Sequence, residues 1–334
     1  MKKRLLITAL CLTLAFNTVV SCLFLYQIYK NKISNSDNTI HMSTNWVPNE
    51  NNPIIGDAST GSLYDPHVIK VNNTFLMYVS IRDNGNIGVV ESKDGINWSD
   101  IKQVLHCDQE SGWEQAVSRC SVVYKDNKYY MYYTGQQNGI SRIGLAISDD
   151  GYNFKKHNKC IITPEYNWEG NSVMNPFVLF DQDDNTFKMW YSAGETFEPD
   201  VVCYAESKDG ITFNKNLYNP VFSKGMEWYD SSKVSVGCVI KRDGKYIMFY
   251  IGYKNKYEAN ICCAVSENGK SKWRRHEENP IVVPTKNTWC NDSIYKPSVI
   301  FNDMSNELML YCNGRNGNDE YIGLYTCPID EFTY

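Results

Sequence analysis

The sequence predicts an all-β fold, a five-bladed β-propeller, preceded by one hydrophobic N-terminal helix. Three observations predict this fold. A short phrase with an Asp-Gly or Asn-Gly turn recurs four times, and a longer pattern of apolar strand, polar turn and aromatic strand recurs five times. The composition is rich in Tyr, Trp, Phe, Val and Ile and also in Asn, Asp and Gly, which is typical of many short strands joined by polar turns.

The short phrase closes each of the first four repeats. Its copies end 56 to 60 residues apart, a period that indicates a repeat architecture. Each Asp-Gly or Asn-Gly pair is a tight-turn signal between two strands, and the aromatic residue after it is interpreted as a packing anchor. We therefore assign the phrase to the scaffold. Its copies are SKDGINW ending at Trp98, SDDGYNF ending at Phe154, SKDGITF ending at Phe213 and SENGKSKW ending at Trp273.

The longer pattern lies upstream of each phrase and occurs a fifth time near the end of the chain, where no closing phrase follows. Each repeat predicts one four-stranded blade, so five repeats predict a five-bladed propeller over residues 61–334. The copies are PHVIKVNNTFLMYVS, CSVVYKDNKYYMYYT, PFVLFDQDDNTFKMWYS, GCVIKRDGKYIMFYI and PSVIFNDMSNELMLYCN.

The N-terminal region is expected to anchor the protein in a membrane. A basic tip precedes an apolar run from Leu5 to about Tyr29, which is long enough to span a bilayer. We expect residues 1–32 to form an uncleaved single-pass signal anchor, with the propeller extracytoplasmic. A cleaved signal peptide, or a lipoprotein ending its leader at Val19-Val20-Ser21-Cys22, is the alternative. Residues 33–60 predict a polar stalk and an outer strand that completes the last blade.

Charge and cysteine spacing exclude several classes of function. The formal net charge of −5 and the pI of about 5.6 leave no basic surplus for nucleic-acid binding. The 12 cysteines include no CxxC pair, so they predict no zinc site. We interpret the strand cysteines as small buried hydrophobic residues, with disulfides left open, and we predict no metal site and no cofactor.

Chemistry is expected where the blades converge. In a propeller blade the inner strand starts, and the second strand ends, on the same face of the disc. Four of the five aligned inner-strand positions are polar, which costs desolvation unless a ligand or mutual ion pairs compensate. We call these five positions the axial residues: Asp65, Arg119, Asn175, Val236 and Lys296. The matching second-strand ends are Arg82 or Asp83, Gln136 or Gln137, Glu195, Lys254 and Arg315.

The opening Tyr64-Asp65-Pro66-His67, with five repeats of the MYYTG and SxDGxxF kind, resembles the five-bladed propeller glycoside hydrolases. These are families 43, 32 and 68, with families 117 and 130 as distant relatives, and the likeness covers about residues 60–330. The chain looks like a divergent branch of them. The resemblance implies that Asp65 is the general base or nucleophile.

The chain departs from this family pattern at two other carboxyls. Family 43 places an Asp at the start of blade three and a general acid Glu near the opening of blade four, where this sequence has Asn175 and, about there, Ser235. Hydrolysis usually requires two carboxyl groups. We therefore choose Glu195, in YSAGETFEPD, as the second. The reserve acids are Glu169, Glu198, Asp230 and Asp292.

The basic residues near the axis predict an anionic group in the ligand, such as a uronic or ulosonic acid carboxylate or a phosphate. The predicted substrate-binding residues are Arg119, Asn175, Lys233, Lys296, Arg315 and His67, with His67 either a subsite contact or a plain strand residue. Aromatic residues in the loops before the blades could stack on sugars or pack between blades. They are Trp113, Trp168, Trp228, Tyr229, Trp289 and Tyr295.

These observations predict a glycosidase that acts on a surface or extracellular carbohydrate, with an anionic sugar as a candidate. Asp65 would be the base or nucleophile and Glu195 the acid. A structural cluster of ion pairs, such as Asp65 with Arg119, is the alternative for the charged ring. Two further functions stay open: a non-catalytic carbohydrate-binding or polysaccharide-assembly propeller, and a phosphate-using glycoside phosphorylase or transferase.

Overall fold

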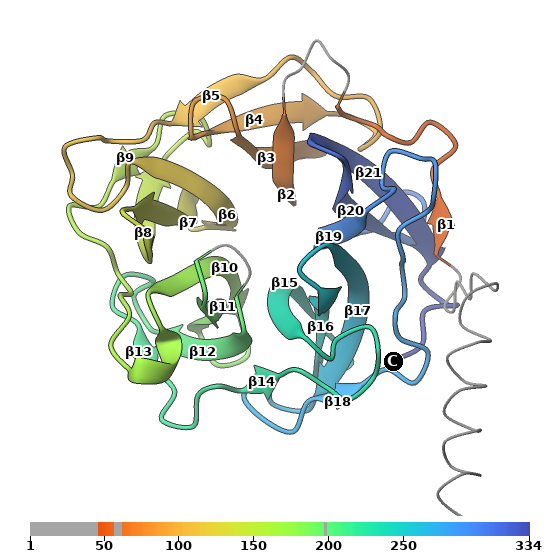
Figure 1. The fold of residues 1–334 in the computed structure, drawn as a ribbon. Coiled ribbons are helices and arrows are strands. Elements are labelled where there is room, and N and C mark those ends of the chain that lie inside the picture. Colours follow the sequence, from red (N-terminus) through yellow and green to blue (C-terminus); the bar gives the residue numbers. More distant parts are fainter. Residues whose placement is uncertain (1–45, 57–61, 197–198) are drawn as a thin grey trace, which may run out of the picture. The chain divides into compact units, whose positions relative to one another are not determined.

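The structure, a computed structural model, describes residues 46–56, 62–196 and 199–334. The predicted membrane anchor, residues 1–32, and most of the predicted stalk lie outside the described residues. Within the described ranges, no helix is long and apolar enough to cross a membrane. The described chain folds as antiparallel strands arranged in five blades around a central axis, which confirms the predicted all-β fold (Figure 1).

Each blade has four layers of strands in antiparallel order, with the first strand innermost; in blade three the outer layer is made of two short strands, which both pair with the third strand. Blade one contains β2 (Leu63–Val71), β3 (Thr74–Ile81), β4 (Asn86–Ser92) and β5 (Lys102–Leu105). Blade two contains β6 (Ala116–Lys125), β7 (Lys128–Gln137), β8 (Ile140–Ser148) and β9 (Lys155–Lys156). Blade three follows the 3-10 turn η2 (Asn167–Glu169) and contains β10 (Ser172–Asp181), β11 (Thr186–Gly194), β12 (Val201–Ser207), β13 (Asn214–Lys215) and β14 (Phe222–Ser223).

Blade four contains β15 (Lys233–Arg242), β16 (Lys245–Asn255), β17 (Glu258–Ser266) and β18 (Arg274–Arg275). Blade five contains β19 (Ser293–Asn302), β20 (Glu307–Asn316) and β21 (Asp319–Pro328). Its outer strand comes from the other end of the described chain, because β1 (Val47–Pro48) pairs with β21. The ring is therefore closed by strands that are distant in the sequence.

The recurring Asp-Gly phrase latches neighbouring blades together. In blade two, Asp150 Oδ1 accepts the N–H groups of Tyr152 and Asn153, both at 2.8 Å, and this fixes the turn. The turn carbonyl of Gly151 then accepts a hydrogen bond from Tyr78 OH in blade one, at 3.1 Å. Equivalent bonds to the other three phrases join Tyr132 OH to Gly210 O, Trp190 Nε1 to Gly269 O, and Tyr311 OH to Gly95 O.

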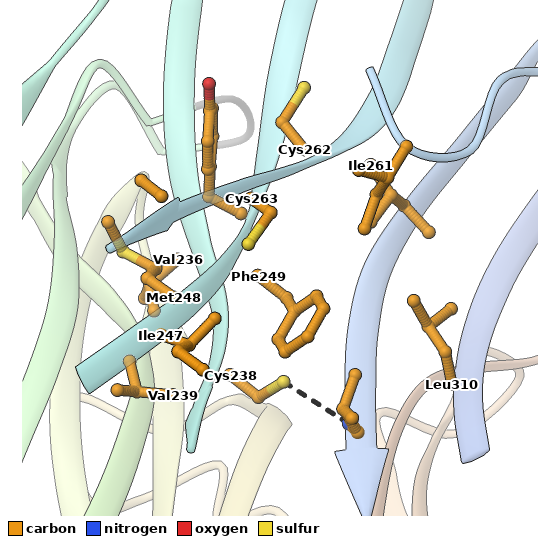
Figure 2. Packing of buried hydrophobic residues seen from close by; sticks show 14 of the residues in the cluster. Val236, Cys238, Val239, Ile247, Met248, Phe249, Ile261, Cys262, Cys263 and Leu310 are labelled. Carbon is orange, nitrogen blue, oxygen red and sulfur yellow. Dashed lines mark hydrogen bonds between the residues drawn. The ribbon is translucent and has the colours of Figure 1, made fainter. Parts of the chain in front are cut away.

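Blade five has no closing phrase, and blade four correspondingly has no side chain that would donate a hydrogen bond to one. The second-strand position that donates the latch bond in the other blades is Phe249 in blade four, which carries no polar donor. Phe249 instead packs among the buried side chains between blades four and five, as Figure 2 shows. Its ring also meets Trp46 and Phe332, at centroid distances of 6.0 and 5.8 Å, so both ends of the described chain seal this junction.

Most of the described cysteines are buried packing residues. Eight of the ten are buried, and none of the ten is in a disulfide. Cys238 lies in the junction drawn in Figure 2, where its sulfur accepts the Val299 N–H at 3.2 Å.

Removing one latch bond is expected to destabilise the propeller. Tyr132→Phe leaves the buried Gly210 carbonyl without its partner, so the free energy of unfolding should fall by about 1–3 kcal/mol. Tyr130→Phe is the matched control, because among the described residues Tyr130 OH has no hydrogen-bond partner, and its effect should stay within about 0.5 kcal/mol. Denaturant unfolding followed by tryptophan fluorescence measures both; equal stability of the two variants would contradict the latch.

Candidate active site

The five inner strands are interrupted at equivalent points, at or beside the axial residues. The antiparallel register with the second strand breaks there in every blade. Four axial residues have a left-handed backbone, which residues other than glycine rarely adopt and which is frequent at functional sites. The φ angles are 56° at Asp65, 52° at Arg119, 58° at Asn175 and 50° at Lys296.

Side chains from the preceding blade hold the axial backbone in place. Four backbone N–H groups donate to residues near the ends of second strands, which we call the support ring: Ser80, Thr134, Ser192 and Asn313. The bonds join Arg119 N–H to Ser80 Oγ (2.9 Å), Asn175 N–H to Thr134 Oγ1 (2.9 Å), Val236 N–H to Ser192 Oγ (3.1 Å) and Asp65 N–H to Asn313 Oδ1 (2.9 Å). Each bond therefore couples the position of an axial side chain to the packing of two blades.

A cavity of about 1130 Å³ opens beside these residues. It brings together many of the side chains predicted from the sequence, which come from all five blades. The predicted residues that line it are Asp65, Arg119, Asn175, Glu195, Lys233, Asp292, Arg315 and the candidate stacking residue Tyr295. Three lining residues that the prediction did not include or gave no role are Arg82, Tyr253 and Glu320.

Asp65 is the buried carboxyl at the axis, with 3% of the residue exposed. Arg119 Nε lies 3.6 Å from its Oδ2, and Ser80 Oγ lies 3.5 Å from the same oxygen. Burial raises the pKa of Asp65 above its ordinary value, although the charges of Arg119 and Lys296 oppose this. A carboxyl with a raised pKa keeps its proton longer and is suited to donate it.

Lys296 is a buried cation close to this carboxyl. Only 3% of the residue is exposed, and among the described residues its amine has no hydrogen bond and no ion pair. Burial lowers the pKa of Lys296 to about 8, while the charge of Asp65 acts in the opposite direction. The axis therefore holds two cations, Arg119 and Lys296, around one carboxyl.

Asn175 and Ser235 occupy the two positions where the resemblance implied carboxyls. Asn175 Nδ2 donates to Ser235 Oγ at 2.7 Å and to the Val236 carbonyl at 3.1 Å. Ser235 Oγ also lies 2.9 Å from Ser192 Oγ. Asn175 Oδ1 is buried without a partner among the described residues. The structure thus has a neutral amide and hydroxyl pair at these positions.

Glu195 lies on the lip of the cavity, and 60% of its side chain is exposed. It forms an ion pair with Lys233, which also contacts Asp200 at 3.3 Å. Glu198 lies outside the described residues. Asp292 also lines the cavity, and its carboxylate accepts the Gly317 N–H at 2.7 Å; this bond holds the pKa of Asp292 below its ordinary value.

The reserve acids Glu169 and Asp230 do not reach the cavity. Both are fully buried inside a blade, where each joins a second-strand tyrosine to an outer-strand cation. Glu114 has the same role in blade two, so this clamp belongs to the scaffold. The clamps are Glu114 with Tyr133 (2.7 Å) and Lys156 (2.8 Å), Glu169 with Tyr191 (3.3 Å) and Lys215 (2.9 Å), and Asp230 with Tyr250 (3.0 Å) and Arg275 (2.6 Å).

His67 and most of the predicted stacking residues are packed into the scaffold. His67 lies 3.1 Å from the Val122 carbonyl through Nε2, and burial lowers its pKa to about 4. Trp113 and Trp289 lie over pairs of glycines in their own blades, so they pack against the sheet. Trp168 and Trp228 are the exposed members, at 39% and 42%.

Glu320 is the buried carboxyl that the sequence analysis missed. It is 5% exposed and accepts hydrogen bonds from Arg82 Nη2 (2.6 Å), Tyr295 OH (2.7 Å) and Asn313 Nδ2 (2.5 Å). Burial raises its pKa. Third strands begin on the face where second strands end, so aligning the starts of the third strands would have drawn attention to Asp319-Glu320.

The buried charge of Lys296 should make stability depend on pH. Its pKa is about 8 when folded and 10.5 when free, so between these values the unfolded chain binds more protons and stability rises with pH. The difference corresponds to about 3 kcal/mol across this window. Denaturant unfolding from pH 7 to 10.5 should therefore show the native protein gaining stability relative to Lys296→Met by about this amount. The comparison with the variant is needed because burial raises the pKa values of several cysteines, which lowers the stability of both proteins as pH rises. Parallel curves for the two proteins would contradict the placement of the amine.

One family model matches most of the chain, and known structures share its architecture. The pattern of the family described as Glycosyl hydrolases family 43 matches residues 51–330. A 1,2-beta-oligomannan phosphorylase of Thermoanaerobacter sp. (strain X514) is 29% identical over 199 residues, which cover 56% of this chain and 61% of that protein. The chain thus matches less than two thirds of that relative's length.

Two solved structures show the same fold at low sequence identity. A thermostable family-43 glycoside hydrolase has a TM-score of 0.65 and 22% identity, with 81% of this chain and 92% of that chain covered. Beta-1,2-mannobiose phosphorylase from Listeria innocua, solved with beta-1,2-mannobiose, has a TM-score of 0.69 and 15% identity, with 86% and 98% covered.

Proposed function

The chain belongs to glycosyl hydrolases family 43 and is a carbohydrate-active protein, and we propose that it cleaves a glycosidic bond by transferring the glycosyl group to inorganic phosphate. The observation that carries this proposal is the composition of the axis. Among the described residues, Asp65 is the one carboxyl of the axial ring, and Arg119 and Lys296 accompany it.

Hydrolysis needs a second carboxyl to activate water or attack the sugar. The other candidates near the cavity have partners of their own: Glu320 accepts three hydrogen bonds, Glu195 is ion-paired on the lip, and Asp292 accepts hydrogen bonds from Gly317 and Asn291. Phosphate brings its own negative charge and needs no general base. It needs cations that hold it, which Arg119 and Arg82 supply from the cavity wall.

The reaction would use Asp65 as general acid. The protonated carboxyl gives its proton to the glycosidic oxygen as the bond from that oxygen to the anomeric carbon breaks. A phosphate oxygen forms the new bond to the anomeric carbon. The hydroxyl proton of the transferred hydrogen phosphate then returns to the Asp65 carboxylate, so the products are a glycosyl phosphate and a shortened saccharide.

Similarity to two phosphorylases supports this reaction and suggests the first substrates to test. The names of both phosphorylases refer to 1,2-beta-linked mannose units. The proposal extends to the N-terminal segment, residues 1–32, which would tether the propeller to a membrane and give it access to extracytoplasmic carbohydrate.

Hydrolysis is the second candidate function, favoured by one observation. Glu320 is a second buried carboxyl of the cavity, and its charge interacts with that of Asp65. If Glu320 acts on water directly, the pair would complete a two-carboxyl site.

Phosphate dependence separates these functions. Incubation with beta-1,2-mannobiose and longer beta-1,2-mannooligosaccharides should yield a glycosyl phosphate only when inorganic phosphate is present, as chromatography or phosphorus NMR detects. Release of free sugar at the same rate without phosphate would contradict phosphorolysis and favour hydrolysis. Saturable binding of the saccharides without any product would favour a carbohydrate-binding protein.

Replacing the axial carboxyl tests the role of Asp65. Asp65→Asn removes the proton donor and should lower kcat about 10²–10⁴-fold with a smaller change in KM. In the native protein, kcat should fall as pH rises through the raised pKa of Asp65, because the acid must carry its proton. Asp303→Asn, at an exposed ion pair with Lys70, is the control and should keep native turnover. Undiminished turnover of Asp65→Asn would overturn the assignment.

A further inference from the structure

One member of the support ring differs from the others. Three members use a hydroxyl to accept the backbone N–H of the next axial residue, and the hydroxyl of Ser80, Thr134 or Ser192 is sufficient for that bond. Blade five has the amide of Asn313 at this position, fully buried, where Oδ1 accepts the Asp65 N–H at 2.9 Å. An amide carries a second polar arm that a hydroxyl lacks.

The second arm of Asn313 reaches Glu320. Asn313 Nδ2 donates to Glu320 Oε2 at 2.5 Å, and this carboxylate also receives Tyr295 OH and Arg82 Nη2. In blades two and four, the third-strand residues in the equivalent register are Ser141 and Ala259. The repeat therefore does not need a carboxylate here, and burying one is costly unless it is well paired.

The carboxylate decides which way the amide points. Only Nδ2 can donate to Glu320, so Oδ1 must face the Asp65 N–H. A neutral residue at 320 would remove this constraint. The Asn313 amide could then turn its donors toward Asp65 N–H, where no acceptor would remain. The left-handed backbone of Asp65 depends on such external support.

The same carboxylate orients a cation of the cavity wall. Glu320 Oε1 accepts Arg82 Nη2 at 2.6 Å, and the Arg82 guanidinium lies over the Tyr64 ring, 5.0 Å from its centroid. About half of the Arg82 side chain stays exposed, and the residue lines the cavity beside Asp65. Arg82 is thus held at one end and open to an anionic reactant along the rest of its surface.

We infer that Glu320 is a positioning residue that fixes the orientation of two groups of the site. It holds Asp65 through Asn313, and it holds the anion-binding Arg82 by direct contact. The inference rests on the proposed function in that Asp65 is the general acid and Arg82 meets the anionic reactant. It assigns no proton transfer to Glu320 itself.

Three substitutions separate the two arms. Glu320→Gln should lower kcat on the order of 10–100-fold, the loss expected from a misplaced acid, and should also raise KM for phosphate several-fold. Asn313→Ala removes only the hydrogen bonds that link Glu320 to the Asp65 backbone, and it should lower kcat with KM for phosphate unchanged. Arg82→Ala removes only the cation that Glu320 holds at the cavity wall, and it should raise KM for phosphate with kcat changed only a few-fold.

A pH profile supplies a readout that a merely structural role would not move. Glu320 and Asp65 repel each other when both are charged, so Glu320→Gln should lower the pKa of Asp65 and shift the basic limb of kcat to lower pH. Carbon-13 NMR of the Asp65 carboxyl, assigned with Asp65→Asn, should show the same shift without turnover. Glu206→Gln is the matched control, because Glu206 also accepts a tyrosine OH and a cation but lies away from the cavity.

Native kcat and an unshifted profile in Glu320→Gln would overturn the inference. So would full activity of Asn313→Ala beside an inactive, folded Glu320→Gln, because Glu320 would then act on the substrate directly. Thermal melting checks folding, and if Glu320→Gln does not fold, Asn313→Ala and Arg82→Ala decide. If native turnover proves independent of phosphate, the proposed reaction fails, while the kcat loss and the Asp65 titration still test the positioning role.

Discussion

The site depends on one hydrogen bond that is repeated around the axis, from an axial backbone N–H to a side chain of the preceding blade. This bond holds the inner strand at its irregular point and so aims the axial side chain. It also joins two neighbouring blades, as do the latch bonds from second-strand side chains to the carbonyls of the Asp-Gly turns. The fold and the site therefore share the same contacts, and a change in blade packing would move the reactive groups.

Burial at the axis gives the charged residues their chemical character. Asp65 is more readily protonated, and Lys296 more readily deprotonated, than either would be in water. Arg119 keeps its charge beside them because a guanidinium does not lose its proton in proteins. One proton donor among cations is an arrangement suited to an anionic acceptor, whereas two opposed carboxyls would suit water.

The sequence was sufficient for the blades and the axial ring because both are repeated. Aligning five copies placed Asp65, Arg119 and Asn175 on one cavity wall, and the turn phrases were correctly assigned to the scaffold. Glu320 was not predicted because it lies on a third strand, and only the first and second strands of the repeats were aligned. The burial of Glu169 could not be read from one copy, since the clamp appears only when the tyrosine and the cation of each blade are seen together.

We propose that the axis binds an anionic reactant beside Asp65, the single carboxyl of the axial ring among the described residues. Isothermal titration calorimetry of inorganic phosphate into the native protein and into Arg119→Met tests this most directly. We expect saturable binding of one phosphate by the native protein and at least about tenfold weaker binding by the variant, the loss expected when one charged contact is removed. Equal affinity of the two proteins, or no saturable binding by the native one, would contradict it.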